Sequence, residues 1–388
     1  MKTQQAIKDS GPPPADRSHA LLSASSSHRW IRCPPSARLC EHVADQGNDY
    51  AKQGSEAHRL CQFKLEAMLG MKTTDPTAEL SFYDGEMENC AESYALYVIE
   101  QVAKAKASCA DPVVLIEQQL DFGRWVESGF GTGDCVIIAD GALSVIDYKH
   151  GKGILVAAED NPQMRLYALG AVDLFEGIFD FDTINMTIYQ PRRENISTDT
   201  LSKAELLQWA DAVLVPAARL AAAGDGDFAA GDHCTFCKAK ATCRKRAEEN
   251  LALAAYDFAP PATLADAEIE AILLKVDELL SWASDIKAFA LQGALAGKAW
   301  AGWKLVEGRA NRKYRDERAV AAAVIAAGLN PYEQKLLGIT AMTAALGKKR
   351  FEEVLGPLIC RPQGKPTLVP ERDKRPVMNS VKNDFLEE

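Results

Sequence analysis

The end of one apolar, β-branched stretch constrains this chain more than any other feature. Residues 142–149 read Ala-Leu-Ser-Val-Ile-Asp-Tyr-Lys, so a strand-like run closes on Asp147 and Lys149, two positions apart. Side chains on a strand alternate between its two faces, so Asp147 and Lys149 project from the same side. Tyr148 points the other way and leaves its carbonyl near that edge. The sequence therefore predicts a strand end that carries a carboxylate beside an ammonium.

A second acid lies just upstream, at Asp134 in the stretch Gly-Thr-Gly-Asp. The residues at 139–141, Ala-Asp-Gly, favour a hairpin turn with positive φ, which would bring Asp134 beside Asp147. Other acid-x-lysine triplets, at 285–287 and 333–335, lie in stretches of helical periodicity without such a neighbour. A surface salt bridge is the alternative for the triplet taken alone. Two carboxylates and one ammonium are what a metal-dependent phosphodiesterase needs.

Two predicted helices bring further polar side chains. Asn161 and Pro162 form a helix start, and Gln163 and Tyr167 follow it four residues apart on one face. An amphipathic helix that begins near residue 53 carries His58 toward its packing partner. Taken singly, a helical tyrosine or a lone histidine is more often a packing residue than a functional one.

The order of these residues resembles the RecB-like branch of the PD-(D/E)XK nuclease superfamily. The resemblance covers residues 20–250 and is carried by His58 after a glycine, Glu117 on a strand, Asp134, Asp147-x-Lys149 and Gln163-x-x-x-Tyr167. It implies an α/β fold with a mixed central sheet flanked by helices, a restriction-endonuclease-like core that cleaves DNA with Mg²⁺ or Mn²⁺. The implied metal ligands are His58, Asp134, Asp147 and the carbonyl of Tyr148. Lys149 would stabilise the attacking hydroxide, and Gln163 and Tyr167 would position the scissile strand.

The cysteines point to a second metal centre. The chain has 10 cysteines, and Cys234, Cys237 and Cys243 cluster in a C-x2-C-x5-C pattern. A disulfide framework is not expected, because no secretory leader precedes Ser10. Three thiolates need a fourth ligand, and the candidates are Cys33, Cys40 and His233. Sulfur-rich tetrahedral sites suit both zinc and iron-sulfur clusters.

The resemblance selects among these candidates. In iron-sulfur members of this nuclease branch, one cysteine precedes the core and three follow it with this spacing, which implies a [4Fe-4S] cluster on Cys33, Cys234, Cys237 and Cys243. A zinc site that uses His233 or Cys33 is the alternative. The other cysteines are interpreted as ordinary small apolar residues: Cys61, Cys90, Cys109, Cys135 and Cys360.

Composition supports a large domain with a smaller appendage, since 47% of the 388 residues are hydrophobic. The formal charge of -10 weighs against a protein that coats nucleic acid, and favours one alternative, a zinc-stabilised interaction protein without catalysis. The other alternative, a zinc- or cluster-stabilised nucleic-acid-binding protein without catalysis, is disfavoured by the intact set of Asp134, Asp147 and Lys149. Two local basic clusters soften this objection, although each is equally consistent with a solvated face. They are Lys238, Lys240, Arg244, Lys245 and Arg246, and Arg309, Arg312, Lys313 and Arg315.

The patterns divide the chain into four parts: a disordered N-terminus at 1–18, a nuclease domain at 19–250 that ends in the cysteine cluster, a mainly helical accessory region at 262–360, and an extended tail at 361–388. Helices are predicted within 36–106, at 163–175, 203–223, 264–295, 316–328 and 340–356, and strands within 113–148, at 183–190 and at 300–308.

No apolar window is long enough to span a bilayer, which predicts a cytoplasmic protein of a bacterial or phage-infected cell. Residues 293–299 lack the spacing and hydroxyl of a P-loop, so ATP-driven unwinding is not expected. The resemblance extends to phage and prophage nucleases. It implies DNA as substrate and an exonuclease that works in recombination with a single-strand annealing or single-strand-binding protein.

Overall fold

The computed structural model describes residues 20–43, 49–252, 265–307, 314–332 and 336–360, and residue 369. The predicted disordered N-terminus and nearly all of the predicted tail lie outside these residues, as do Arg309, Arg312 and Lys313. The chain divides into two compact units, Met1–Gln292 and Gly293–Glu388. Each is described by itself.

A five-stranded mixed sheet forms the centre of the first unit, with the strands in sequence order. The strands are β1 (Val113–Asp121), β2 (Phe130–Ala139), β3 (Gly141–Tyr148), β4 (Phe181–Gln190) and β5 (Asn195–Ser202). Neighbouring strands are antiparallel except β3 and β4, which are parallel. A parallel pair needs a crossover, and α5 (Pro162–Phe175) provides it. The predicted α/β class with a mixed sheet is therefore confirmed.

The tight connection between β2 and β3 is the predicted hairpin. Ala139 pairs with Ala142 across it, and Gly141 has a φ of 84°, in the left-handed region that favours glycine. The strand β5 was not predicted. Its residues alternate between half-buried and exposed and include few apolar side chains, as an edge strand allows.

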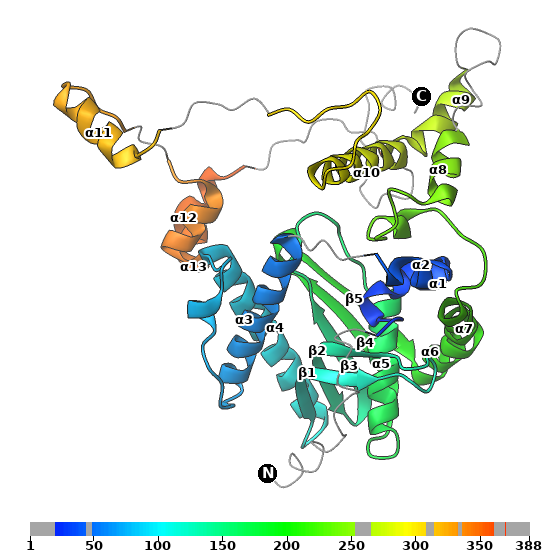
Figure 1. Cartoon of the computed structure of the whole chain (residues 1–388). Coiled ribbons are helices and arrows are strands. Elements are labelled where there is room, and N and C mark those ends of the chain that lie inside the picture. The colour runs from blue at the N-terminus through cyan, green and yellow to red at the C-terminus, as the bar shows by residue number, and fades with distance from the viewer. Residues whose placement is uncertain are drawn as a thin grey trace, which may run out of the picture. The chain divides into compact units, whose positions relative to one another are not determined.

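Helices cover both faces of the sheet (Figure 1). On one face, α3 (Asp49–Met68) and α4 (Gly85–Ser108) bury Leu60 and Val98 in a cluster with Ile137 of β2. On the other face, α5 buries Leu169 against Val136. Val136 and Ile137 are adjacent in β2, and adjacent side chains on a strand point to opposite faces, so each packs against a different helical layer. The prediction of helices flanking the sheet is confirmed.

The segment predicted as one helix at 203–223 has three parts: α6 (Lys203–Trp209), a π-helical turn (Ala210–Leu214) and α7 (Val215–Ala223). Pro216 lacks an amide proton and so interrupts the regular hydrogen-bond ladder. Among the described helices, this segment is long and apolar enough by length and composition to cross a membrane. Leu206, Leu214 and Ala218 belong to the domain core, but most of this apolar window is not buried, so the expectation that no window could span a bilayer is not confirmed.

Short helices surround the cysteine cluster. The chain enters through α1 (Ser27–Arg32) and α2 (Ser36–Glu41), and α8 (Arg244–Leu251) follows the cysteines. The helix predicted at 264–295 is broken after residue 273 into α9 (Asp266–Leu273) and α10 (Val276–Leu295). Fully buried Arg246 joins α8 to α10, through ion pairs of 2.6 Å with both Glu278 and Asp285.

The second unit contains α11 (Glu317–Ala326), α12 (Ile339–Leu346) and α13 (Lys348–Leu355). The segment at 300–308 was predicted as a short strand and turn. Its described residues, 300–307, contain the turn, but the predicted strand is wrong because the rest of the backbone is irregular. A strand needs a partner for its backbone groups, and no described strand of this unit supplies one. Instead, the Trp300 ring lies 3.9 Å from the ammonium of Lys298.

Candidate active site

Three acids occupy one row across three adjacent strands. The residues on either side of Glu117 pair with those on either side of Asp134, so Glu117 lies opposite Asp134. Cys135 pairs with Ile146, so the same register puts Asp134 opposite Asp147 at the end of β3. The hairpin thus brings two of these acids together, as its sequence predicted, and β1 adds the third.

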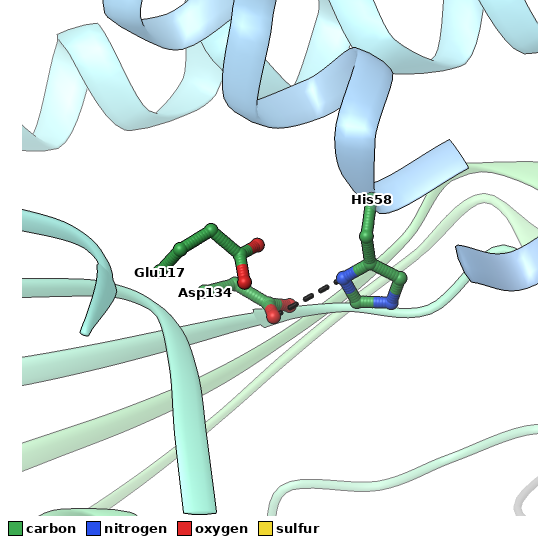
Figure 2. A group of neighbouring side chains, drawn as sticks. All are labelled: His58, Glu117 and Asp134. Atoms are coloured by element: carbon green, nitrogen blue, oxygen red, sulfur yellow. Dashed lines mark hydrogen bonds and ion pairs between the residues drawn. The ribbon is translucent and has the colours of Figure 1, made fainter. Parts of the chain in front are cut away.

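A group of possible metal ligands forms around Asp134. Donor atoms of His58, Glu117 and Asp134 all lie within 4.8 Å of one another. Figure 2 shows that His58 reaches this group from α3, while Glu117 and Asp134 come from strands. His58 Nδ1 lies 3.1 Å from Asp134 Oδ1, and the amide of Tyr148 donates a 2.7 Å hydrogen bond to Asp134 Oδ2. Two carboxylates and one imidazole can bind Mg²⁺ or Mn²⁺.

Glu117 has an unusual backbone. Its φ of 48° lies in the left-handed region, which is uncommon for a residue other than glycine. Such conformations cost free energy and cluster at functional sites. Burial, together with the nearby Asp134 carboxylate, raises the pKa of Glu117 to about 7. A bound cation would relieve this repulsion, because it neutralises both carboxylates at once.

A second set of contacts continues from Asp147 to α5. Lys149 Nζ lies 2.9 Å from Asp147 Oδ2 and donates a 3.2 Å hydrogen bond to Gln163 Oε1. Gln163 Nε2 lies 3.2 Å from Asp147 Oδ1 and 3.1 Å from the Tyr167 hydroxyl. The Asn161 side chain caps the helix by accepting hydrogen bonds from the first-turn amides, which fixes where Gln163 starts. Gln163 therefore contacts each of the three other predicted side chains: Asp147, Lys149 and Tyr167.

Burial and charge together set the protonation of these groups. Burial raises the pKa of Asp147 above its ordinary value, although Lys149 opposes this. For Lys149, burial lowers the pKa, but Asp147 outweighs that effect and the net shift is upward. Burial also lowers the pKa of His58, but the Asp134 carboxylate outweighs burial and raises that pKa to about 9. The imidazole is therefore protonated at neutral pH, and a cation that binds it must displace that proton.

Tyr148 faces the opposite side of the sheet, as the strand period predicted. Its ring is fully buried and meets the His58 ring edge-on, with 5.5 Å between the centroids. Its hydroxyl lies 2.8 Å from Nδ1 of buried His150. Tyr148 contacts the acidic row through its amide. The role of its carbonyl as a metal ligand stays a prediction. His150 was not among the predicted site residues. Its position three residues after Asp147 could have indicated that it lies near the site.

A contact between two cysteines joins the segment that enters the sheet domain to the segment that follows it. Among the described residues, Cys33, Cys234, Cys237 and Cys243 do not form a group close enough to share one metal ion. Cys40 Sγ lies 3.6 Å from Cys237 Sγ, across 197 residues of sequence. The amide of Ala229 donates a 3.5 Å hydrogen bond to Cys33 Sγ, and the Ala229 carbonyl lies 4.0 Å from Cys234 Sγ. Cys243 is half-buried at the start of α8. Of the three candidates for a fourth ligand, Cys40 is the one in contact with a cysteine of the C-x2-C pair.

Hydrogen bonds perturb these thiols. The hydrogen bond with Cys237 lowers the pKa of Cys40 to about 5, and the same bond raises the pKa of Cys237. His233 forms a hydrogen bond with Cys33, which lowers the pKa of Cys33 despite its burial and raises that of His233. A thiolate at Cys40 beside a thiol at Cys237 is a donor pair that soft metals bind.

The fold and the site define an α/β protein with a five-stranded mixed sheet and a carboxylate–imidazole donor group. Residues 19–376 match the family described as "Protein of unknown function (DUF2800)", and the chain belongs to that family. A solved structure described as "Crystal structure of SSO0001" is similar at 14% identity, over 50% of this chain and 98% of that one, with a TM-score of 0.24. That score is too low to assign a fold.

Proposed function

We propose that this protein is a metal-dependent DNA nuclease with the restriction-endonuclease-like core of the PD-(D/E)XK superfamily, in its RecB-like branch. The observation that carries the proposal is the row of Glu117, Asp134 and Asp147 at the end of β3, with His58 and Lys149 beside it. Surface acids are usually dispersed and solvated. Here Asp134 and Asp147 are 8% and 2% exposed, and His58 and Lys149 offset their charges in the absence of a metal. A metal cation that displaces the proton of His58 would take over part of that role.

His58, Glu117 and Asp134 would hold that cation, and Asp147 lies next in the row. Carboxylate oxygens suit Mg²⁺ and Mn²⁺ alike, while an imidazole makes manganese more acceptable. A cation at this position would supply a hydroxide nucleophile at neutral pH and offset charge on the phosphate. This ligand set differs from the one implied by resemblance, because it includes Glu117 and leaves Asp147 and the Tyr148 carbonyl outside the donor group.

The residues around Asp147 have roles of their own. The Lys149 ammonium remains charged in its buried pair, so it can stabilise an anion that forms beside Asp147. Gln163 contacts Lys149, Asp147 and Tyr167 at once, and so fixes the orientation of all three. The Tyr167 hydroxyl remains a hydrogen-bond donor, because burial holds its pKa well above the usual range. Gln163 and Tyr167 would thereby position the scissile strand.

The cysteines would hold a [4Fe-4S] cluster, with zinc as the alternative. Cys33, Cys234, Cys237 and Cys243 are the ligands that the family resemblance implies. The proximity of both Cys33 and Cys40 to the segment 229–237 supports a metal that joins the two ends of the nuclease domain. The contact between Cys40 and Cys237 makes Cys40 the competitor of Cys33 for one position.

The setting that fits this chemistry is phage DNA recombination or processing in the cytoplasm of a bacterial or phage-infected cell. An exonuclease there would work with a single-strand annealing or single-strand-binding protein. The formal charge of -10 restricts contact with DNA to the site and its surroundings.

The deciding experiment is digestion of linear duplex and single-stranded DNA with Mg²⁺, Mn²⁺ or a chelator. Purified wild-type protein should cleave only with a metal, and Asp147→Asn should not cleave. The matched control is Asp140→Asn, which removes an exposed carboxylate from the turn of the same hairpin and should cleave normally. A wild-type protein that binds DNA but cleaves none of it with either metal would favour the non-catalytic alternative.

A further inference from the structure

His150 is a buried histidine that the proposed mechanism does not use. It follows β3 directly, is 6% exposed, and stacks on the Tyr148 ring with 5.9 Å between the centroids and 30° between the planes. Burial, together with the Arg192 guanidinium, lowers the pKa of His150 to about 4, so the ring is neutral and can accept a hydrogen bond at Nδ1. The Tyr148 hydroxyl donates that bond over 2.8 Å.

The backbone of His150 is anchored as well. The guanidinium of Arg192, which follows β4, donates a 3.4 Å hydrogen bond to the His150 carbonyl. The same guanidinium forms a 2.8 Å ion pair with Glu86 of α4. His150 is therefore held by two elements of the domain, and its ring offers the Tyr148 hydroxyl an acceptor in a fixed place.

Tyr148 contacts two of the three possible metal ligands. Its amide donates the 2.7 Å hydrogen bond to Asp134 Oδ2, and its ring meets the His58 ring edge-on at 5.5 Å. The His58 side chain is 30% exposed, so it borders solvent on one side and the tyrosine ring on the other. The Tyr148 hydroxyl also forms a hydrogen bond with the Cys61 thiol, three residues after His58 on α3. The tyrosine thus connects the end of β3 to the helix that carries His58.

The hydroxyl decides where the Tyr148 ring lies. Tyr94 of α4 packs edge-on against this ring, with 5.3 Å between the centroids. Pairs of aromatic rings are stable over a range of distances and offsets, so this contact alone leaves the ring free to slide. A hydrogen bond restricts both distance and direction. The bond with His150 therefore determines how closely the ring approaches His58.

We propose that His150 is a positioning residue of the metal site: through the Tyr148 hydroxyl, it holds the tyrosine ring against His58 and so keeps the imidazole within reach of Asp134 and Glu117. This inference rests on the metal site of the proposed function. It assigns a role in metal binding to a side chain that contacts none of the three ligands itself.

The first test measures Mn²⁺ binding by calorimetry, without DNA. His150→Leu removes the acceptor and should weaken binding roughly fivefold, the effect of one lost hydrogen bond in a buried site. Tyr148→Phe keeps the ring, removes the donor and should weaken binding equally. His150→Asn returns an acceptor near the position of Nδ1 and should restore most of the affinity. Wild-type affinity in His150→Leu would overturn the proposal.

The matched control is Tyr189→Phe. Tyr189 pairs with Tyr148 on the neighbouring strand and belongs to the same apolar cluster, but its hydroxyl forms a hydrogen bond with Ser93. The control loses a hydroxyl from the same layer of the domain and should bind Mn²⁺ as the wild type does. An equal loss of affinity in Tyr189→Phe and Tyr148→Phe would show a general effect of packing and overturn the proposal.

A double-mutant cycle separates positioning from support of the fold. In a His58→Ala background, His150→Leu should change Mn²⁺ affinity by less than about twofold, because the imidazole that it positions is gone. The same loss of roughly fivefold in both backgrounds would mean that His150 does not act through His58, and would overturn the proposal.

Cleavage of linear DNA separates this role from the nuclease function. In His150→Leu, the Mn²⁺ concentration for half-maximal cleavage should rise roughly fivefold, while the rate at saturating Mn²⁺ should change less than about twofold. A wild type that binds Mn²⁺ with coupled His58 and His150 but cleaves no DNA would reject the nuclease and retain the positioning role. Cleavage with unchanged Mn²⁺ dependence in His150→Leu would do the reverse. Absence of Mn²⁺ binding by the wild type would reject both.

Discussion

His58 Nδ1 and Asp134 Oδ1 lie 3.1 Å apart, although 76 residues separate them in sequence. The first comes from helix α3 and the second from strand β2, so this contact joins the helical layer to the sheet at the acidic row. The pair also links charge to metal binding: Asp134 raises the pKa of His58, and His58 lowers the pKa of Asp134, so each favours the ionised form of the other.

Lys149→Met should abolish cleavage, by several orders of magnitude, because the ammonium that stabilises the developing anion is lost. The single variant also leaves the buried Asp147 carboxylate unpaired, so it should melt at a lower temperature. The double variant Lys149→Met/Asp147→Asn should recover much of the stability and none of the activity. Wild-type cleavage by either variant, with contaminating nuclease excluded, would disprove the role of Lys149.

Glu117→Gln should weaken binding of Mn²⁺ at least about tenfold, since one of the two carboxylates in the donor group is lost. The isosteric amide leaves the strained backbone unchanged. Isothermal titration calorimetry measures the affinity, and Glu127→Gln, at an exposed acid, is the control. Unchanged affinity for Mn²⁺ in Glu117→Gln would show that Glu117 is not a metal ligand.

His58 makes metal binding depend on pH. Its pKa of about 9 without metal means that a cation must displace a proton, so affinity should rise with pH and level off above about 9. Titrations in two buffers of different ionisation enthalpy should report that released proton. In His58→Ala, metal affinity should no longer rise between about pH 7, near the pKa of Glu117, and about pH 9. The variant should also shift the metal preference toward Mg²⁺. An unchanged Mn²⁺ preference would contradict the assignment.

The same histidine contributes to the stability of the metal-free fold. Its folded-state pKa lies above the ordinary 6.5, so this contribution is fully present below pH 6.5 and is lost as the pH rises through about 9. In chelator, the difference in melting temperature between wild type and His58→Ala should shrink over that window. A difference that stays constant would show that the imidazole acts through packing alone.

Anaerobically purified protein should be brown, with broad visible absorption from the [4Fe-4S] cluster. Cys237→Ser should remove the colour and lower the melting temperature, because the cluster closes a loop of about 200 residues. Cys33→Ser and Cys40→Ser then identify the fourth ligand, since only the substitution that removes a cluster ligand should remove the colour. One zinc without iron or labile sulfide in the wild type would decide for the zinc alternative.

Local patterns determined a large part of the site. The period of two placed Asp147 and Lys149 on one side of β3 and Tyr148 on the other, and the 139–141 turn with Gly141 placed Asp134 beside Asp147. The Asn161 cap set the start of α5 and so the face shared by Gln163 and Tyr167. These are effects of neighbouring residues, in which sterics and the nearest hydrogen bonds decide the geometry.

Tertiary packing decided the rest. Which strand would oppose Asp134 depended on the pairing of β1, and this made Glu117 a member of the donor group. The contact of Cys40 with Cys237 likewise arises between segments whose own periodicity does not specify their partners. Contacts across 76 or 197 residues form because whole layers bury their apolar faces together, and that free energy belongs to the assembled core rather than to any short stretch of sequence.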